Sequence, residues 1–237
     1  MTAHAVIRAR GYPWAGRQPD ASSHARVDAA VRAGAVPALA YGSNASPEVL
    51  RRKLGEAAAA AVVARPVVLR DVDVVYSAHI SAHGAIPATL HRSPGTQVGA
   101  WLLAVPADAI GALDATEPNY VRRPYAGAHA YLSRHGELRL DGHPVALAAV
   151  TARGRRLPAL TQAEVLERVR LALAPEQSPD DFVLDHVLDA SLRQRRTEML
   201  HDGFRARSGC AWVYARSGDT YSDERNDEAS GGRSSGA

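Results

Sequence analysis

The folds open to this chain are limited first of all by a short apolar run that ends in small, turn-forming residues. Residues 37–41 read as a buried strand, and Gly42-Ser43-Asn44 follow as residue types that turn the backbone. Ser46 suits the N-cap of a helix and Pro47 its first position, so the loop leads into a helix. A strand, a tight loop and a helix N-terminus direct several backbone N–H groups at one point, where a carboxylate or an oxyanion can bind. The alternative is an ordinary strand-to-helix connection, which this stretch alone does not exclude.

The composition of the 237 residues fits a soluble protein with one main domain. The formal net charge is +3, and no run of five or six like charges marks a nucleic-acid-binding arm. No apolar run approaches the ~20 residues of a membrane span, and the N-terminus lacks the apolar core of a signal peptide. Cys210 is the single cysteine, which fits a reducing compartment. We expect a cytoplasmic protein that binds neither nucleic acid nor membrane; the oligomeric state stays open.

The first part of the chain carries few signals of regular structure. Residues 1–34 have little periodic apolar pattern and are expected to form a loosely ordered lead-in. A short helix near residues 27–32 is its one candidate element. Tyr12-Pro13-Trp14 could dock on the body of the protein.

Residues 35–155 are expected to fold as one compact domain built on β-strands. Runs of β-branched and aromatic residues predict the strands, and a Ser-Pro-Gly-Thr sequence at 93–96 predicts a turn. Short helices at 47–54 and after Pro106 make this an α+β domain. The strand-like runs after the opening loop are 67–69, 72–76, 97–105, 126–132 and 145–151.

The pattern changes to helices near residue 156. Thr161 and Glu164 form a capping box, which predicts a helix that should run to about Leu173. A second helix should begin after Ser178 and reach about Leu200.

The C-terminal boundaries follow from this change and from the composition beyond it. We expect residues 156–214 to pack on the first domain as a helical extension, with an edge strand at 211–214. Residues 215–237 are rich in Gly, Ser and charge, which predicts a disordered tail.

Two histidines, His79 and His83, lie four residues apart and raise the question of a metal site. On a strand that rises about 3.3 Å per residue they would be about 13 Å apart, too far to share one ion. Gly84 and Pro87 argue against the helix that would bring them together. We therefore expect pocket-wall or surface histidines and no bound metal.

Glu117 stands at the end of a short predicted helix, immediately before Pro118-Asn119. A carboxylate at such a turn can face a cleft. The alternative is a solvent-facing acid paired with one of the arginines in Arg122-Arg123. Tyr120 and Tyr125, which follow the turn, are candidates for lining the same pocket, although a tyrosine after a turn more often serves packing.

Three stretches, in this order, resemble the gamma-glutamylcyclotransferase-like (AIG2-like) family. They are ALAYGSNASPEVL, GAIPATLHRSPGTQVGAWLLAV and ALDATEPNYVRRPY. Within them Asn44 and Glu117 are 73 positions apart. The resemblance covers about residues 37–150. Pro118 stands where a glycine often follows the glutamate, and Ala45 where a leucine often follows the asparagine.

The resemblance implies a compact mixed β-barrel flanked by helices, here with additional C-terminal helices. It implies cyclisation of the γ-glutamyl group of a small amide or peptide to 5-oxoproline with release of the amine, without a cofactor. It assigns the general acid/base role to Glu117 and the binding of this small-molecule substrate to the loop of Tyr41, Gly42, Ser43 and Asn44. A non-catalytic small-molecule binding protein and an interaction protein on the same fold stay open as alternatives.

Overall fold

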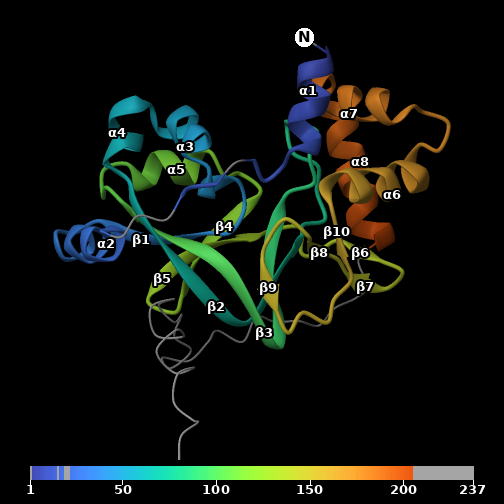
Figure 1. Ribbon diagram of the computed structural model, residues 1–237. Helices are drawn as coiled ribbons and strands as arrows, with labels where there is room; N and C mark the ends of the chain where they lie inside the picture. Colours follow the sequence, from blue (N-terminus) through green and yellow to red (C-terminus); the bar gives the residue numbers. More distant parts are fainter. Residues whose placement is uncertain (1, 15, 19–21, 205–237) are drawn as a thin grey trace, which may run out of the picture.

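The computed structural model describes residues 2–14, 16–18 and 22–204. It shows a mixed α+β fold in which a large sheet is flanked by helices (Figure 1). The helical elements are α1 (Thr2–Arg10), α2 (Ser23–Arg32), η1 (Ser43–Ala45), α3 (Pro47–Leu54), α4 (Glu56–Ala61), α5 (Ile110–Ala115), α6 (Gln162–Leu173), α7 (Pro179–Leu188) and α8 (Ala190–Phe204). The strands are β1 (Val36–Ala40), β2 (Val63–Tyr76), β3 (Ala88–Val105), β4 (Tyr120–Tyr125), β5 (Ala128–Ser133), β6 (Arg139–Leu140), β7 (His143–Pro144), β8 (Ala146–Leu147), β9 (Ala152–Arg153) and β10 (Ala159–Leu160).

The main sheet contains both parallel and antiparallel pairs. Within the described residues its strand order is β10-β8-β2-β3-β1-β5-β4, and β9 also pairs with β3. The antiparallel pair of β2 and β3 is its longest ladder. β1 lies between β3 and β5, so the strand that leads into the Tyr-Gly-Ser-Asn loop has an inner position. Leu39 is buried in one hydrophobic cluster and Ala38 and Ala40 in another, so both faces of β1 are covered, which explains its apolar sequence.

A bulge interrupts the ladder between β2 and β3. Arg70 pairs with Gln97 and Val72 pairs with Arg92. The single residue Asp71 of β2 therefore lies opposite residues 93–96 of β3. Gly95 has a φ of +81°, and its N–H donates to Asp71 Oδ1 at 2.7 Å. The turn predicted at 93–96 is therefore a bulge inside one long strand, where the chain bends without leaving the sheet.

The sheet does not close on itself in the described part of the chain. The pairing path has two ends, β10 and β4, which do not pair with each other. The strands from β6 to β10 are two residues long each, too short to extend the ladder around to β4. In place of the closed barrel that was expected, the structure has an open mixed sheet with helices.

Two helix starts predicted from local signals are confirmed. α3 begins at Pro47. At the start of α6 the Thr161 hydroxyl accepts from the Glu164 N–H at 3.3 Å, and the Glu164 carboxylate accepts from the Thr161 N–H at 2.7 Å. This reciprocal pair is the predicted capping box.

The helix expected to run from Ser178 to about Leu200 is divided into α7 and α8. Asp189 between them has an extended backbone, and its Oδ1 accepts from the Leu192 N–H at 2.9 Å. An aspartate that caps the next helix in this way ends the preceding one.

The described part of residues 1–34 contains two helices, where a loosely ordered lead-in was expected. It contains α1 and α2, and α2 begins at Ser23, before the short helix indicated by the sequence. α1 packs against α6 and α7, and α2 packs against β2 and β3. Val6 and Ala9 of α1 and Val27 of α2 are buried. Packing of this kind stabilises helices whose own sequences carry a weak signal.

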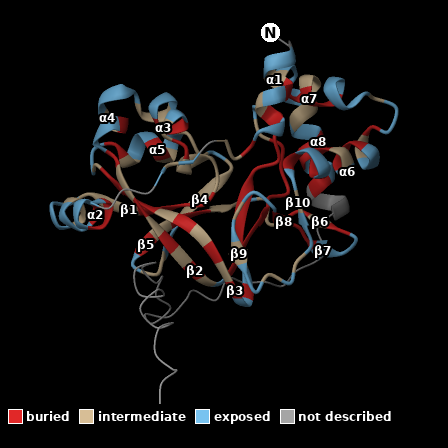
Figure 2. Ribbon diagram, viewed as in Figure 1, coloured by how far each residue is buried: buried red, intermediate tan, exposed pale blue. Residues whose placement is uncertain are grey.

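One hydrophobic cluster joins the sheet to helices from both ends of the chain. It includes Val6 of α1, Val67 of β2, Phe182 of α7 and Leu200 of α8. Buried residues lie along the strands and on the inner helix faces, whereas much of α2 and α4 is exposed (Figure 2). The expected lead-in, the domain of 35–155 and the described part of the 156–214 extension thus share a core. The edge strand expected at 211–214 and the tail expected at 215–237 lie outside the described residues.

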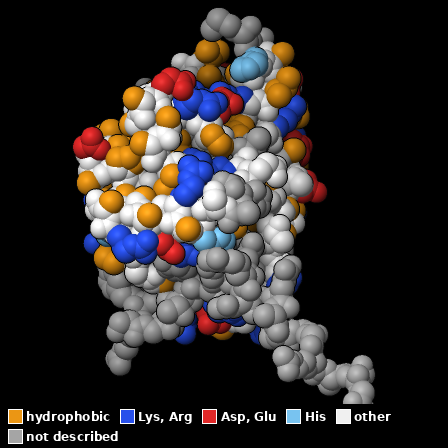
Figure 3. All heavy atoms as spheres, turned by 60° about the vertical axis from the view of Figure 1, so that its left-hand side comes forward, with side chains coloured by type: hydrophobic (Ala, Val, Ile, Leu, Met, Phe, Trp, Pro, Cys, Tyr) orange, Lys and Arg blue, Asp and Glu red, His pale blue; other side chains and the backbone are white. Residues whose placement is uncertain are grey.

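The surface carries charges of both signs. On the face shown in Figure 3, Lys and Arg side chains form separate small groups with acidic and uncharged surface between them. Among the helices that the structure describes, none combines the length and the apolar character needed to cross a membrane.

Candidate active site

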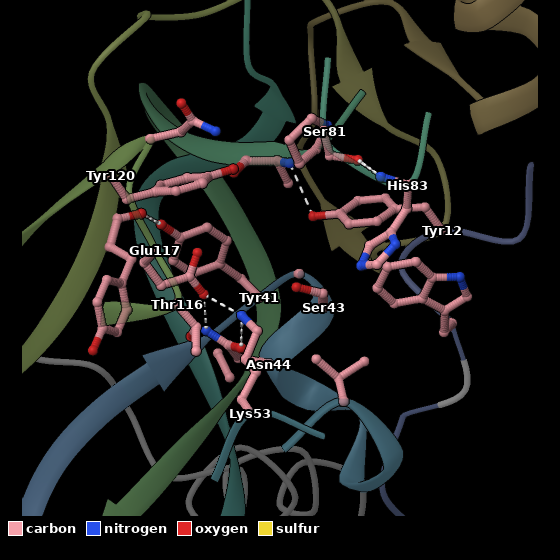
Figure 4. A pocket seen from close by; sticks show the side chains of 18 of the residues that line it. Tyr12, Tyr41, Ser43, Asn44, Lys53, Ser81, His83, Thr116, Glu117 and Tyr120 are labelled. Carbon is pink, nitrogen blue, oxygen red and sulfur yellow. Dashed lines mark hydrogen bonds and ion pairs between the residues drawn. The ribbon is translucent and has the colours of Figure 1, made fainter. Parts of the chain in front are cut away.

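The loop after β1 and the turn after α5 meet in the folded chain. Asn44 Nδ2 donates a hydrogen bond to Glu117 Oε1 at 2.8 Å, although the two residues are 73 positions apart (Figure 4). Asn44 lies in η1, and Glu117 lies between α5 and β4. α5 packs against α3, which follows the loop, and this packing brings the turn to the loop. The Glu117 side chain is 12 % exposed, so it does not point into bulk solvent.

Lys53 completes a polar group with Asn44 and Glu117. Its Nζ lies 2.5 Å from Glu117 Oε1 and 2.8 Å from Asn44 Oδ1. Lys53 is in the last turn of α3, so the loop and the helix behind it supply both polar neighbours of the acid. An ammonium group attracts a carboxylate at this distance, so Lys53 helps to hold the Glu117 side chain in place. Of the two alternative partners indicated by the sequence, Arg122 binds elsewhere, with its Nε 2.9 Å from Asp114 Oδ1, and Arg123 is exposed.

These residues face a cavity of about 450 Å³, a volume in the range of small-molecule sites. Much of its wall is aromatic, from Tyr12, Tyr41, Tyr120 and Tyr131. The Tyr120 hydroxyl donates to the Ala88 carbonyl at 2.9 Å, and the Tyr41 hydroxyl donates to the Tyr131 carbonyl. Burial raises the pKa of all four tyrosines, so their hydroxyls stay neutral at physiological pH.

Tyr12 reaches the loop from the N-terminal segment. Its hydroxyl accepts from the Ala88 N–H at 2.9 Å, and the Ser43 N–H faces the same oxygen. A Cβ at residue 42 would lie 2.5 Å from this hydroxyl. Gly42 is therefore required by the close approach of Tyr12.

Most of the loop amides have partners inside the protein. The N–H groups of Ala45 and Ser46 donate to carbonyl oxygens of the same turn at 3.0 Å. The Ser43 N–H faces a tyrosine hydroxyl. Most of the loop N–H groups that were expected to bind a ligand therefore form hydrogen bonds within the protein. The polar groups that contact Glu117 are instead the side chains of Asn44 and Lys53.

His79 and His83 both line the cavity, as the pocket-wall interpretation expected. His79 Nδ1 lies 2.7 Å from Ser77 Oγ, and its ring stacks on His135 with centroids 4.8 Å apart. Burial, with a smaller contribution from His135, lowers the pKa of His79 to about 3, so the ring is neutral. The His83 ring meets Trp14 edge to face at 5.7 Å. The described residues contain no group of three or more His, Cys, Asp or Glu side chains that could hold a metal ion.

All but one of the residues predicted for the site line this cavity. Tyr125 is the exception: it lies at the far end of β4 and packs against the main hydrophobic cluster. It is five residues from Tyr120, and an odd separation along a strand places two side chains on opposite faces. The predicted residues that line the cavity are Tyr41, Gly42, Ser43, Asn44, Glu117 and Tyr120.

Other cavity residues were not predicted, among them Lys53, Tyr12, Trp14 and Arg52. Lys53 had a signal, since it is the only lysine in a chain with 28 basic residues and it lies on the helix that follows the loop. The sequence indicated that the segment with Tyr12 and Trp14 could dock on the body of the protein, but it did not indicate that these residues line the cavity. Nothing in the sequence distinguished Arg52 from its neighbours.

Comparison of the chain with protein-family models, with curated proteins and with solved structures gave no significant match. The functional conclusions below therefore depend on the geometry of the site and on the motif resemblance.

Proposed function

We propose that this protein is a γ-glutamyl cyclotransferase that converts the γ-glutamyl group of a small amide or peptide to 5-oxoproline. The observation that carries the proposal is the contact between Asn44 Nδ2 and Glu117 Oε1 at 2.8 Å, at the edge of a cavity of about 450 Å³. It brings together residues from two of the three stretches on which the family resemblance depends. The open sheet, in place of the closed barrel that the resemblance implies, serves as the scaffold that holds them together.

The proposed reaction is an intramolecular attack. The α-ammonium of the γ-glutamyl group loses a proton, and the amine forms a bond to its own γ-carbonyl carbon. The attacking nitrogen, positively charged after the attack, loses a second proton as the bond from this carbon to the leaving nitrogen breaks. The leaving nitrogen takes up both protons and departs as an ammonium group. Glu117 takes the first proton and returns it to the leaving nitrogen, a contribution of typically 10²–10⁴-fold. Because both reacting groups belong to one molecule, a cavity that holds the substrate folded lowers the barrier further.

The neighbours of Glu117 have separate roles in this proposal. Lys53 Nζ and Asn44 Nδ2 both contact Oε1, so they fix the orientation of the carboxylate. The tyrosine walls exclude water, and their neutral hydroxyls do not compete for the proton. The chemistry balances without a metal or a redox cofactor.

The test is release of 5-oxoproline by the purified protein from γ-glutamyl dipeptides, glutathione and γ-glutamyl amines. We expect at least one substrate to react and Glu117→Gln to lower the rate by about 10²–10⁴-fold. Glutamine keeps the size of the side chain and an acceptor oxygen for Asn44, so the variant should fold. The matched control is Glu56→Gln on α4, whose carboxylate is far more exposed and does not line the cavity.

The second candidate, a non-catalytic binding protein, gives a different result in the same assay. The Lys53 ammonium occupies one oxygen of the Glu117 carboxylate, as it would in a purely structural ion pair. In that case γ-glutamyl compounds would raise the melting temperature without forming 5-oxoproline, and Glu117→Gln would still bind them.

A further inference from the structure

The two ends of the cavity differ in chemistry. At one end Glu117 and Lys53 form an ion pair. Tyr12 and His83 line the other end, across the cavity from Glu117 (Figure 4). With the reacting atoms of a γ-glutamyl group at Glu117, a leaving group that extends across the cavity meets Tyr12 and His83.

Trp14 forms part of the far end and is held in place by α1 and the turn after it. Its Nε1 donates to the Arg8 carbonyl at 2.8 Å, and its backbone N–H donates to the Gly11 carbonyl at 2.8 Å. Its ring contacts Tyr12 edge to face, with centroids 5.4 Å apart, and also contacts His83. Trp14 precedes the region of family resemblance, so the resemblance does not account for this wall.

Helices from the C-terminal part support the same wall from behind. α1 packs against α6 and α7, and Arg10 Nη2 lies 2.6 Å from Asp180 Oδ1. Gly84, next to His83, lies so close to α7 that a Cβ on it would be 3.0 Å from Val183. The segments on both sides of the region of resemblance therefore shape the far end of the cavity together.

The far end carries more positive than negative charge. Arg52 lines the cavity, with its Cζ 5.9 Å from the centre of the Trp14 ring, and Arg8 Cζ lies 5.0 Å from the same ring. Among the described residues both guanidinium groups have an ion pair with Glu48, each at 3.9 Å, and this side chain is 65 % exposed. One exposed carboxylate does not balance two guanidinium groups.

Nearby positive charges also affect the protonation of His83. Burial lowers the pKa of its ring, and the charges of Arg8, Lys53 and Arg193 lower it further. His83 is thus neutral at physiological pH and adds a polar but uncharged group to the far end. At the other end the charges of Lys53 and Glu117 cancel.

We infer that Trp14 and Arg52 form a second subsite, which binds a carboxylate on the leaving group. The protein then prefers γ-glutamyl amino acids or peptides to γ-glutamyl amines that lack a carboxylate. Arg52 supplies a guanidinium group, whose planar donors match a carboxylate, and Trp14 supplies a rigid surface for the carbon atoms next to it. This inference rests on the proposed function for the position of the γ-glutamyl group.

The test compares γ-glutamyl-alanine with γ-glutamyl-alaninamide, which differ only in the carboxylate. We expect kcat/KM for the acid to exceed that for the amide by about 10- to 100-fold, the effect of a hydrogen bond to a charged group. Arg52→Gln should lower kcat/KM for the acid more than for the amide and so remove most of the preference. The matched control is Arg51→Gln, on the same helix and outside the cavity lining, which should retain it.

A binding measurement separates this inference from the proposed function. Titration calorimetry on the Glu117→Gln variant measures the affinity for both compounds without turnover. A preference for the acid that Arg52→Gln removes supports the subsite, even if no 5-oxoproline is ever formed. Equal affinity for acid and amide, or a preference that Arg52→Gln leaves intact, overturns the subsite, whether or not the protein is a cyclotransferase.

Discussion

The Glu117 carboxylate has its polar neighbours on one segment of chain, the loop and helix that follow β1. Asn44 and Lys53 both contact Oε1, and they also contact each other through Asn44 Oδ1. The side chains of Lys53 and Glu117 are partly buried, so water and salt screen their interaction less than they screen a surface ion pair. A displacement of the carboxylate by about 1 Å can cost about 100-fold in rate.

Lys53→Met tests this positioning role. We expect kcat for 5-oxoproline formation to fall by roughly 10- to 100-fold with little change in KM, because the carboxylate loses one of its two anchors. Lys53→Arg should restore part of the rate, since it keeps the charge but not the shape. The measurement is steady-state kinetics, with melting temperatures to confirm folding.

The control for this prediction is Arg51→Met on the same helix. Arg51 reaches the exposed Glu56 at 3.8 Å and does not line the cavity, so its loss should leave kcat unchanged. An unchanged kcat in Lys53→Met would show that the ammonium does not position the acid.

At the scale of elements, a buried ion pair attaches the segment after β9 to β2. Asp73 is fully buried in β2, and the Arg155 guanidinium binds it through Nε at 2.9 Å and Nη2 at 2.8 Å. Arg155 also donates to the Val150 carbonyl at 3.2 Å. A carboxylate in this position depends on its partner, because an unpaired buried charge is strongly unfavourable.

Arg155→Met should destabilise the protein by about 3 kcal/mol or more, since it leaves the Asp73 charge without its partner. The neighbouring Arg156 is exposed, and Arg156→Met should change the free energy of unfolding by less than about 0.5 kcal/mol. Urea unfolding of the two variants and the parent measures both values. Equal stabilities would show that the pair is dispensable for the attachment of this segment.

At the scale of the whole molecule, buried neutral histidines link stability to pH. Burial is the largest cause that lowers the pKa of both His79 and His186 to about 3, with added effects of His135 on the former and of Arg196 and Arg193 on the latter. The unfolded chain has histidine pKa values near 6.5, so between these values it binds more protons than the folded chain. The stability that these histidines contribute is complete above pH 6.5 and decreases as the pH falls toward 3.

We therefore expect the free energy of unfolding to fall by roughly 2 to 4 kcal/mol between pH 7 and pH 5, at about 1.4 kcal/mol per pH unit and histidine. Urea unfolding at a series of pH values measures the slope. His186→Gln removes one of the two groups and should reduce the slope by about half. A slope that His186→Gln does not change would mean that other groups carry the pH dependence.

Local signals predicted many of the elements. The capping box of Thr161 and Glu164 and the helix start at Pro47 depend on residues within one turn, and both were found where expected. The β-branched runs predicted the central strands, although the bulge at Gly95 lies inside one strand where a turn was expected. The lead-in was mispredicted because α1 and α2 are stabilised by contacts with elements distant in sequence.

The sequence by itself determined the starts of α3 and α6 and the apolar runs of the central strands, because these depend on neighbours a few residues away. It also singled out Asn44 and Glu117 through their motifs. Only the tertiary structure decided that Lys53 joins them, that Tyr12 and Trp14 close the cavity, and that Tyr125 faces elsewhere. The reason is physical: these relationships depend on how the strands pair and how the helices pack, which no local stretch of sequence specifies.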